Sequence, residues 1–377
     1  MRRWILVGLG AFLALVLVVR LLAPIVALRF VNDILATLPD YDAHAADVDL
    51  EILSGNIVIR GLEVVRPGVE GPHFLDIDAV VVHPLLQPAM HGEHILDLDL
   101  FEPHVAFVVG PDDSRSQLWI DPTWVSDLLR RFPATIDRLG IARGEARYID
   151  ESAKPKVDLT LDHIAIGGTN LSNLAHDPKP LFGHIAANAQ LFEEGKLEAV
   201  IDLDPYAESP HFALQAKAAS ISLPALDAAF RAYGHFDVEA GSASGTMSLT
   251  ASGGGYKGVA DPVIAHLEVV RLETDPQDKK NPLRFVWESL IGTVANVASV
   301  ATPGTDRIEL HVPLQGRFDD KSLVLVVLKI LPRAWFGTLL HALEAATASG
   351  KEAAQLIAET VPIAKSEKAD SHDHRRR

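Results

Sequence analysis

Pairs of acidic residues are the first candidates for chemistry in this sequence. Aspartates occur two positions apart in Asp76/Asp78, Asp97/Asp99 and Asp202/Asp204, a spacing that places both carboxylates on one face of a β-strand. Two carboxylates across a cleft hydrolyse glycosidic bonds when an apolar setting raises the pKa of one of them. The sequence around these pairs shows neither a cleft nor an apolar setting, so it favours the solvated face of a sheet.

Two glycine-rich segments match catalytic or phosphate-binding motifs only in part. Gly241–Gly245 has the glycines of a nucleophile elbow, but its central residue is Ala243 instead of serine. Ser252–Lys257 lacks the Gly-Lys-Ser/Thr ending of a phosphate loop and predicts a hairpin turn. No set of nucleophile, base and orienting residue emerges, so we expect no catalytic residues and a protein that is not an enzyme. A membrane-bound hydrolase is the weakest of the alternatives.

Metal ligands are restricted to nitrogen and oxygen, because the 377-residue chain has 16 histidines and no cysteine. The lack of cysteine excludes disulfides, iron–sulfur clusters, cysteine-ligated zinc and thiol catalysis. His91 and His94 lack the spacing of a helical zinc site. His372 and His374 could hold a divalent ion weakly, but they lie in a charged, solvated tail. The sequence predicts no metal and no cofactor, and its net charge of −16 argues against nucleic acid as a partner.

The first 28 residues predict a membrane anchor. Two arginines precede an apolar run from Trp4 to Val19, and Trp4 to Pro24 supplies 21 residues, enough to cross a hydrocarbon core of about 30 Å as a helix. If the leading arginines stay in the cytoplasm, the chain after Pro24 is exported. A cleaved signal peptide and a buried helix are the alternatives. The expected anchor residues are Trp4, Leu13, Val19, Arg20 and Leu22.

Alternation of apolar and polar residues dominates the chain after the anchor and predicts strands with one apolar face. Turn-forming separators between these segments favour antiparallel neighbours. The apolar face is either covered by helices and a second sheet or left partly open as a trough. The candidates for lining such a trough, each of which fits an ordinary core better, are Val48, Leu50, Ile52, Leu96, Leu98, Leu100, Phe212 and Leu214.

Few helices are expected. Residues 25–38 fit a short amphipathic helix on a membrane surface, and further helices are predicted at Leu118–Phe132, Leu223–Tyr233, Leu283–Val300 and Ala334–Glu359. The predicted organisation is an anchor (1–28), a β-rich module with a short helix (29–133), a second β-rich module (134–240), a C-terminal β segment with an apolar helix and a terminal helix (241–361), and a disordered tail (362–377).

The order of several short segments resembles one known family. These segments are Val48–Leu62, Leu75–Val82, Ile95–Val105, Gly255–Pro262, Ile308–Pro313, Gly316–Asp320 and Leu331–Phe336. Together with the N-terminal anchor, they resemble the DUF748 branch of the AsmA-like inner-membrane proteins from Met1 to about Ala346. No single segment is specific, and the likeness depends on their order. The chain is short for the wider superfamily.

This resemblance implies a fold that is mainly β with a few helices. The N-terminal transmembrane helix would be followed by an elongated antiparallel β-sheet that forms a curved, groove-like structure, and then by a C-terminal helix. It implies a single-pass inner-membrane protein with a cytoplasmic N-terminus and a periplasmic bulk, involved in phospholipid handling or transport and in outer-membrane integrity. The implied partners are membrane lipids and an envelope protein, and the oligomeric state stays open. The alternative is a non-catalytic envelope scaffold or assembly factor that docks other proteins through Leu283–Val300 or Ala334–Glu359.

Overall fold

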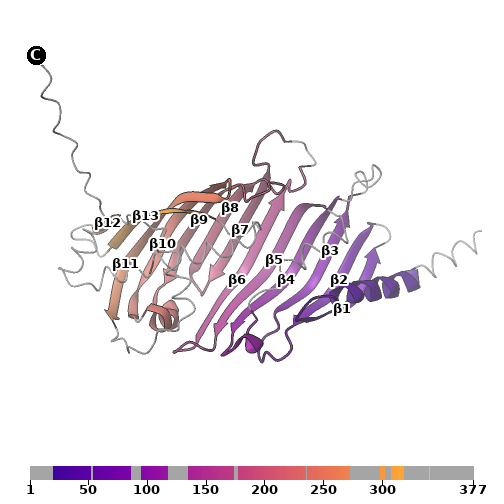
Figure 1. Cartoon of the computed structure of the whole chain (residues 1–377), viewed down its shortest axis with the longest axis horizontal. Helices are drawn as coiled ribbons and strands as arrows, with labels where there is room; N and C mark the ends of the chain where they lie inside the picture. The colour runs from indigo at the N-terminus through magenta and orange to yellow at the C-terminus, as the bar shows by residue number, and fades with distance from the viewer. Residues whose placement is uncertain are drawn as a thin grey trace, which may run out of the picture.

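The computed structural model describes residues 20–51, 54–85, 95–117, 135–173, 177–234, 236–271, 298–301, 307–317 and 339. These residues form a mainly β structure with a single 13-stranded sheet. Figure 1 shows the strands side by side, with the colour changing steadily from one end of the sheet to the other, because chain order and spatial order nearly coincide. The sheet is open, and among the described strands β1 and β12 form its two edges.

The first six strands are β1 (Asp42–Glu51), β2 (Asn56–Val65), β3 (Leu75–Pro84), β4 (Ile95–Val109), β5 (Thr135–Asp150) and β6 (Val157–Thr169). The other seven are β7 (Gly183–Leu191), β8 (Gly195–Leu203), β9 (Phe212–Ser222), β10 (Phe236–Ser252), β11 (Gly255–Arg271), β12 (Ala298–Ala301) and β13 (Arg307–Arg317). Strands β12 and β13 exchange places, so that β13 pairs with β11 and β12 lies outside it.

One pairing departs from the predicted antiparallel sheet. Strands β4 and β5 run parallel, with Leu98 opposite Leu139 and Leu100 opposite Ile141, whereas the other described pairs of neighbouring strands are antiparallel. Parallel neighbours need a crossover connection that returns the chain to the starting end of the sheet. Residues 110–134 make this connection, and it includes the 3₁₀ turn η1 (Asp113–Arg115).

The two glycine-rich segments have the structural roles of a turn and a strand. Gly253 and Gly254 both have positive φ angles, +58° and +76°, between the paired residues Ser252 and Gly255. Two central residues with positive φ form the type I′ turn that matches the twist of a hairpin, so the predicted hairpin turn is confirmed. The segment Gly241–Gly245 lies inside β10.

Besides the 3₁₀ turn η1, two helical segments contact the sheet in the described part of the chain. Residues 20–35 form a helix, which includes part of the helix expected at 25–38. Asn32 on this helix bonds the outer edge of β1: its amide nitrogen donates to the Ala45 carbonyl at 3.1 Å, and its amide oxygen accepts from the Ala45 N–H at 2.7 Å. This contact satisfies backbone groups that the edge strand would otherwise leave unpaired.

The second helical segment follows β9 and confirms the helix predicted at Leu223–Tyr233. It consists of the 3₁₀ turn η2 (Pro224–Leu226), the α-helical turn α4 (Asp227–Ala229) and the π-helical turn η3 (Phe230–Gly234). Pro224 occupies the first turn, where its missing N–H costs no hydrogen bond. The buried residues Leu226, Ala229 and Phe230 turn one side of the segment toward the sheet.

Several predicted elements lie wholly or largely outside the described residues. They are the anchor as far as Val19, the helix at Leu118–Phe132, most of the helices at Leu283–Val300 and Ala334–Glu359, and the tail. The end of the helix predicted at Leu283–Val300 is wrong, because Ala298–Ala301 is strand β12. Of the helices that the structure describes, none combines the length and hydropathy of a membrane span. The predicted module boundary at 240 falls within β10, and strands of all three predicted β modules join one sheet.

Buried apolar side chains concentrate toward the C-terminal end of the sheet. We call this cluster the C-terminal core; its larger members are Ile201, Leu203, Phe212, Leu214, Ile221, Leu223, Leu226, Phe230, Met247, Leu249, Ile264, Leu310, Val312, Leu314 and Leu339. A smaller cluster at the N-terminal end contains Leu38, Tyr41, Val64 and Phe74, where the Tyr41 and Phe74 rings have centroids 4.9 Å apart.

Candidate functional site

The strand register aligns apolar residues in two continuous rows across the sheet. Residues directly opposite each other on neighbouring strands point to the same face, so a row can be followed from strand to strand. The first row is Leu50, Ile57, Val82, Leu98, Leu139, Gly168, Ile185, Ile201, Leu214, Leu249, Gly258 and Leu314. The second is Val48, Ile59, Val80, Leu100, Ile141, Ile166, Ala187, Ala199, Ala216, Met247, Ala260 and Val312. We call the side that carries both rows the apolar face.

The trough-lining residues proposed from the sequence that the structure describes all lie on this apolar face. Five of them, Val48, Leu50, Leu98, Leu100 and Leu214, are members of the two rows. Leu96 lies opposite Pro84 and Ile136, and Phe212 lies opposite Leu203 and Ala251. Ile52 falls outside the described residues. The register thus joins residues up to 166 positions apart in sequence (48 to 214) on one surface.

The same residues divide into two groups by exposure. Leu50, Leu96, Leu98 and Leu100 are half-buried, and they retain surface that another molecule can touch. Val48, Phe212 and Leu214 are 1%, 1% and 2% exposed, so the chain itself already covers them. Members of both rows on strands β2 to β7 are half-buried apart from the buried Gly168; this half-buried region comprises Ile57, Ile59, Val80, Val82, Leu98, Leu100, Leu139, Ile141, Ile166, Ile185 and Ala187.

A hydrogen-bonded cluster fixes the helical segment at residues 224–234 against strand β5. The Tyr233 hydroxyl donates to Oδ2 of Asp150 at 2.8 Å and lies 3.4 Å from the Tyr148 hydroxyl. Oδ1 of Asp150 accepts the N–H groups of Ser152 and Ala153 at 2.9 and 3.0 Å. Asp150 is only 1% exposed, and these donors replace the water that a buried carboxylate loses.

Burial changes the ionisation of the two tyrosines in this cluster. Burial raises the pKa of Tyr233 far above its usual range, and the neighbouring Tyr148 and Asp150 act in the same direction. Burial likewise raises the pKa of Tyr148, an effect that its hydrogen bond with Tyr233 partly offsets. Both phenols therefore stay protonated where an exposed tyrosine would ionise, and the Tyr233 hydroxyl acts as a donor to the carboxylate.

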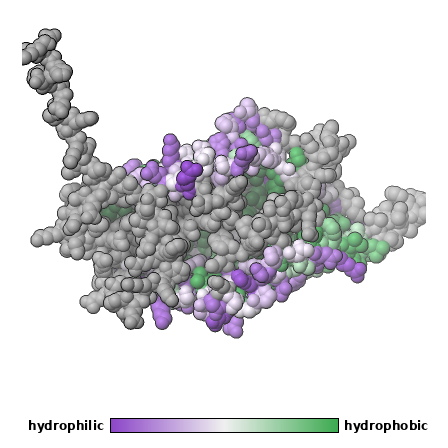
Figure 2. All heavy atoms as spheres, viewed as in Figure 1, coloured by the Kyte–Doolittle hydropathy of each residue, from purple (hydrophilic) through white to green (hydrophobic). Residues whose placement is uncertain are grey.

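An exposed apolar patch covers the helix at residues 20–35. Its members are Leu21, Leu22, Ile25, Val26 and Phe30, with 61%, 54%, 50%, 64% and 53% of their surface exposed. Figure 2 shows hydrophobic residues gathered where Figure 1 places this indigo helix, beyond the β1 edge of the sheet. Large apolar side chains that lie together and are this exposed are typical of a surface that contacts a membrane or another protein.

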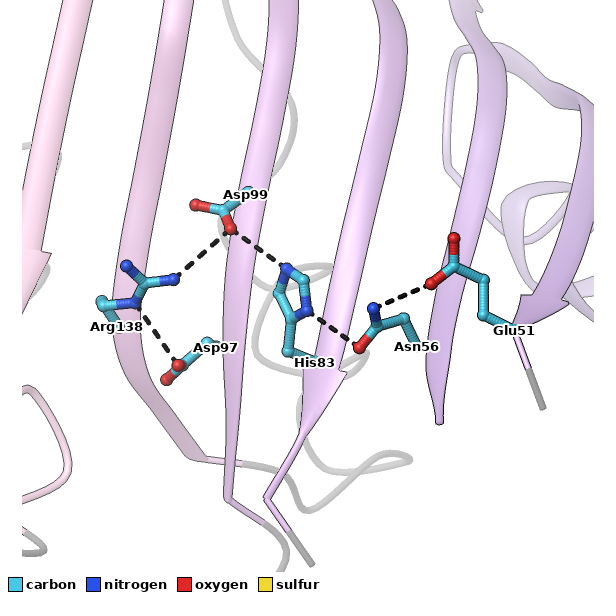
Figure 3. Close-up of polar contacts among 6 residues, drawn as sticks. All are labelled: Glu51, Asn56, His83, Asp97, Asp99 and Arg138. Atoms are coloured by element: carbon cyan, nitrogen blue, oxygen red, sulfur yellow. Dashed lines mark hydrogen bonds and ion pairs between the residues drawn. The ribbon is translucent and has the colours of Figure 1, made fainter. Parts of the chain in front are cut away.

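The opposite face of the sheet is polar, and its most extended polar network crosses strands β1 to β5 (Figure 3). The Asn56 amide donates to Oε2 of Glu51 at 2.9 Å. Its amide oxygen lies 2.9 Å from Nδ1 of His83, whose Nε2 lies 3.1 Å from Oδ2 of Asp99. Arg138 continues the network: its Nε lies 3.3 Å from Oδ2 of Asp97, and its Nη2 lies 3.6 Å from Oδ2 of Asp99.

The six residues of this network bind neighbouring strands together. Carboxylates, an amide, an imidazole and a guanidinium alternate, so each acceptor oxygen faces a donor on the next strand. His83 meets an acceptor oxygen on both sides, and both of its ring nitrogens donate when the imidazole is protonated. Asp97 and Asp99, one of the acidic pairs singled out in the sequence, thus hold Arg138 and His83 in cross-strand contacts.

Comparison with known proteins adds no relatives to this picture. No family model matches the chain, and a search of curated proteins gives no significant match. The functional proposal therefore depends on the geometry of the two faces and on the residues that carry them.

The sequence signals were uneven for the residues described above. Alternation located the apolar face, but no local pattern indicated that Asn32 bonds Ala45 or that Tyr233 bonds Asp150. The residues of each pair are 13 and 83 positions apart. Such contacts depend on which strands become neighbours, which periodicity alone does not determine.

Proposed function

We propose that this protein is a membrane-tethered, non-catalytic carrier whose apolar sheet face takes up the acyl chains of phospholipids. The observation that carries the proposal is the half-buried region on strands β2 to β7. It is a continuous apolar surface, eleven side chains over six strands, that the chain covers only in part. Acyl chains are the ligand chemistry that such a long, uniformly aliphatic surface fits.

The free energy of lipid transfer explains why a continuous surface matters. Each acyl CH₂ group brought into water costs about 0.8 kcal/mol, so a two-chain lipid needs cover along its whole path between membranes. The apolar rows run across the sheet without an interruption by a charged residue. The 13 strands at about 4.8 Å spacing give a sheet about 60 Å wide. A partner protein or a shuttle movement would complete a longer route.

The place of action in this proposal is the periplasmic surface of an inner membrane. The exposed apolar patch on residues 20–35 follows directly on the apolar run that ends at Val19, and both suit contact with lipid. The resemblance to the AsmA-like DUF748 group supports the same location, with a cytoplasmic N-terminus, a periplasmic sheet curved into a groove, and a role in outer-membrane integrity. Lipid entering from the membrane would first meet the β1 end of the sheet.

Lipid content of the purified chain tests this proposal. The double substitution Leu98→Asp/Leu100→Asp places two charges in the half-buried region, and we expect at least a tenfold loss of co-purified phospholipid by mass spectrometry, because acyl chains do not pack against solvated carboxylates. Val200→Asp is the matched control. Val200 lies on the polar face, 39% exposed, and its substitution should leave bound lipid unchanged. Equal lipid content in all three proteins would overturn the proposal.

A second function, an envelope scaffold or assembly factor, is favoured by the burial of the C-terminal core. Phe212 and Leu214 already pack within the chain, so that end of the apolar face offers stability instead of ligand contact. A scaffold would use the exposed edges and helices to dock an envelope protein. Two results together would favour the scaffold over the carrier. One envelope protein would co-purify stably with this chain, and the chain would still dock that protein after its lipid had been removed.

A further inference from the structure

A group of metal-ligating side chains lies on the polar face near the β1 edge. Glu63 on β2, His73 in the loop before β3, and Asp76 on β3 each place one ligand atom within 4.8 Å of the other two. Nδ1 of His73 is 2.8 Å from Oδ1 of Asp76. Two ligands that share a tetrahedral zinc ion are about 3.4 Å apart, so a small rotation of exposed side chains brings all three into range.

The strand register extends this group into a cross-strand row of possible ligands. Going from β1 to β5, His44 lies opposite Glu63, Glu63 opposite Asp76, Asp76 opposite His104, and His104 opposite Glu145. Nε2 of His44 is 3.6 Å from Oε2 of Glu63. Imidazoles and carboxylates thus follow one another on five neighbouring strands. The alternation changes phase between this row and the apolar rows, because Ala46 and Asp47 are both exposed between the buried Ala45 and Val48 and because Gly61 and Glu102 have positive φ angles. This change of phase puts the row on the exposed side of the sheet.

The charge balance at this group differs from that of several acidic sites on neighbouring strands, which pair with arginine. Arg60 pairs with Asp47, Arg138 with Asp97 and Asp99, Arg143 with Glu102, and Arg147 with Asp158. The ion pairs recorded for Glu63 and Asp76 within the described residues are with histidines alone, His44 and His73. When these histidines are neutral, the carboxylates of Glu63 and Asp76 face each other across β2 and β3, and within the described part of the chain neither forms an ion pair with an arginine or a lysine.

We propose that Glu63, His73 and Asp76 bind a divalent transition-metal ion of the zinc class, with His44 as the adjacent fourth ligand. Mixed imidazole and carboxylate ligands suit zinc, whereas magnesium and calcium prefer oxygen alone. The bound ion supplies the charge that arginines supply elsewhere on this face. It ties β1, β2, β3 and the loop before β3 together beside the helix at residues 20–35, and it stabilises the end of the sheet nearest the proposed membrane. The side chains of His73 and Asp76 are 43% and 41% exposed, so an ion can reach them from solvent.

Zinc titration of the full chain tests the site. To remove a background from the tail, all proteins carry His372→Ala and His374→Ala. We expect one zinc ion per chain by calorimetry and a rise in melting temperature with zinc. His73→Ala and Asp76→Asn should each weaken zinc binding at least tenfold and abolish that rise. His44→Ala should weaken binding less, because its imidazole lies at the border of the group.

His184→Ala provides the matched control. Nδ1 of His184 is 2.8 Å from Oδ1 of Asp202 on the neighbouring strand, the same distance as between His73 and Asp76 but without a second carboxylate in the group. This variant should bind zinc as the parent does. The proposal is overturned if the parent binds no zinc, if His73→Ala and His184→Ala behave alike, or if magnesium competes equally with zinc. Circular dichroism of each variant without metal verifies that the sheet has formed, so a loss of binding reports the ligands themselves.

Discussion

The half-buried region and the C-terminal core belong to the same two apolar rows but differ in how the chain covers them. Leu98 and Leu214 make the comparison concrete, because both are leucines of the first row and both have aliphatic neighbours on the adjoining strands. Leu98 is half-buried, whereas Leu214 is 2% exposed. The pattern of residues is therefore the same in the two regions, and the difference lies in what packs on top of them.

The helical segment at residues 224–234 is one source of that difference. Leu223, Leu226 and Phe230 pack into the C-terminal core, and Ala229 packs with Val157 on β6. At the other end of the sheet, the helix at residues 20–35 bonds the edge of β1 and turns its large apolar side chains outward. One helical segment packs into the buried core, and the other adds exposed apolar surface beside the sheet. The same alternating pattern can therefore form a buried core at one end of a sheet and a partly exposed apolar surface at the other.

The largest expected effect comes from truncating the two leucines. Leu214→Ala should lower the free energy of unfolding by about 3–4 kcal/mol, because it leaves a cavity in a fully packed site. Leu98→Ala should cost about 1–1.5 kcal/mol, since solvent already reaches that side chain and no closed cavity forms. Urea denaturation followed by circular dichroism measures both. Equal losses would mean that the two regions are covered alike, and the distinction between them would fail.

Sequence periodicity predicted much of the sheet but not its directions or its covers. Alternation around Leu50 and Leu98 gave strands and the correct common face, and the glycines after Ser252 gave a hairpin turn. A period of two contains no information on strand direction, so the parallel pair β4–β5 was missed. The strand at Ala298–Ala301 was missed because a short apolar run fits a helix and a strand equally, and pairing with β13 decides between them.

The polar features were harder to predict than the apolar ones. Acidic pairs such as Asp97 and Asp99 were recognised as a sheet face, but their partners His83 and Arg138 come from other strands. The group at Glu63, His73 and Asp76 has no motif in the sequence, because its members are brought together by the register of β2 and β3. Residue spacing could only have found it once the strand pairing was known.

Tyr233→Phe should have the next largest effect, because it removes a hydrogen bond to a buried carboxylate. We expect a loss of about 1.5–3 kcal/mol and faster hydrogen exchange in residues 224–234, which would make the sealed region resemble the half-buried one. Tyr206→Phe is the control: Tyr206 is 58% exposed, and its hydroxyl donates to the Ser172 carbonyl at 3.3 Å. Similar stability changes in the two variants would show that the Asp150 contact does not hold the cover in place.

The same cluster predicts a loss of stability at alkaline pH. The pKa of Tyr233 is raised in the folded chain, whereas an unfolded tyrosine ionises near pH 10. The folded state therefore binds the proton more tightly, so the stabilisation is complete below about pH 10 and declines as the pH rises above it. Unfolding midpoints between pH 8 and 11 should fall more steeply for the parent than for Tyr233→Phe. Parallel curves would contradict this assignment.

Asn32→Ala tests the attachment of the exposed helix and should cost about 1 kcal/mol. The substitution removes both side-chain bonds to Ala45 and returns the β1 edge to solvent. Hydrogen exchange should increase in residues 20–35 and at Ala45 while the C-terminal core stays protected. Asp33→Ala, on the exposed side of the same helix, is the control. Increased exchange throughout the sheet would mean that the β1 edge and the C-terminal core unfold together as one cooperative unit.

The smallest effect is expected on the polar face, where the contacts are open to water. Arg147 and Asp158 form two short bonds, at 2.8 and 2.6 Å, and the hydrogen bonds from Arg147 hold the pKa of Asp158 below its usual value. Arg60 and Asp47 make one contact at 3.3 Å. Arg147→Gln should cost at most about 1 kcal/mol and Arg60→Gln almost nothing, because solvent screens both pairs.

Since the folded pKa of Asp158 is lowered, the contribution of its pair is present above pH 4 or so and declines as the pH falls below that value. High salt should shrink the Arg147→Gln effect further, whereas it should leave the Leu214→Ala loss in place, because that loss comes from packing. A salt-insensitive cost for Arg147→Gln would mean that this face is buried as well, and the division of the sheet into a solvated and an apolar side would have to be redrawn.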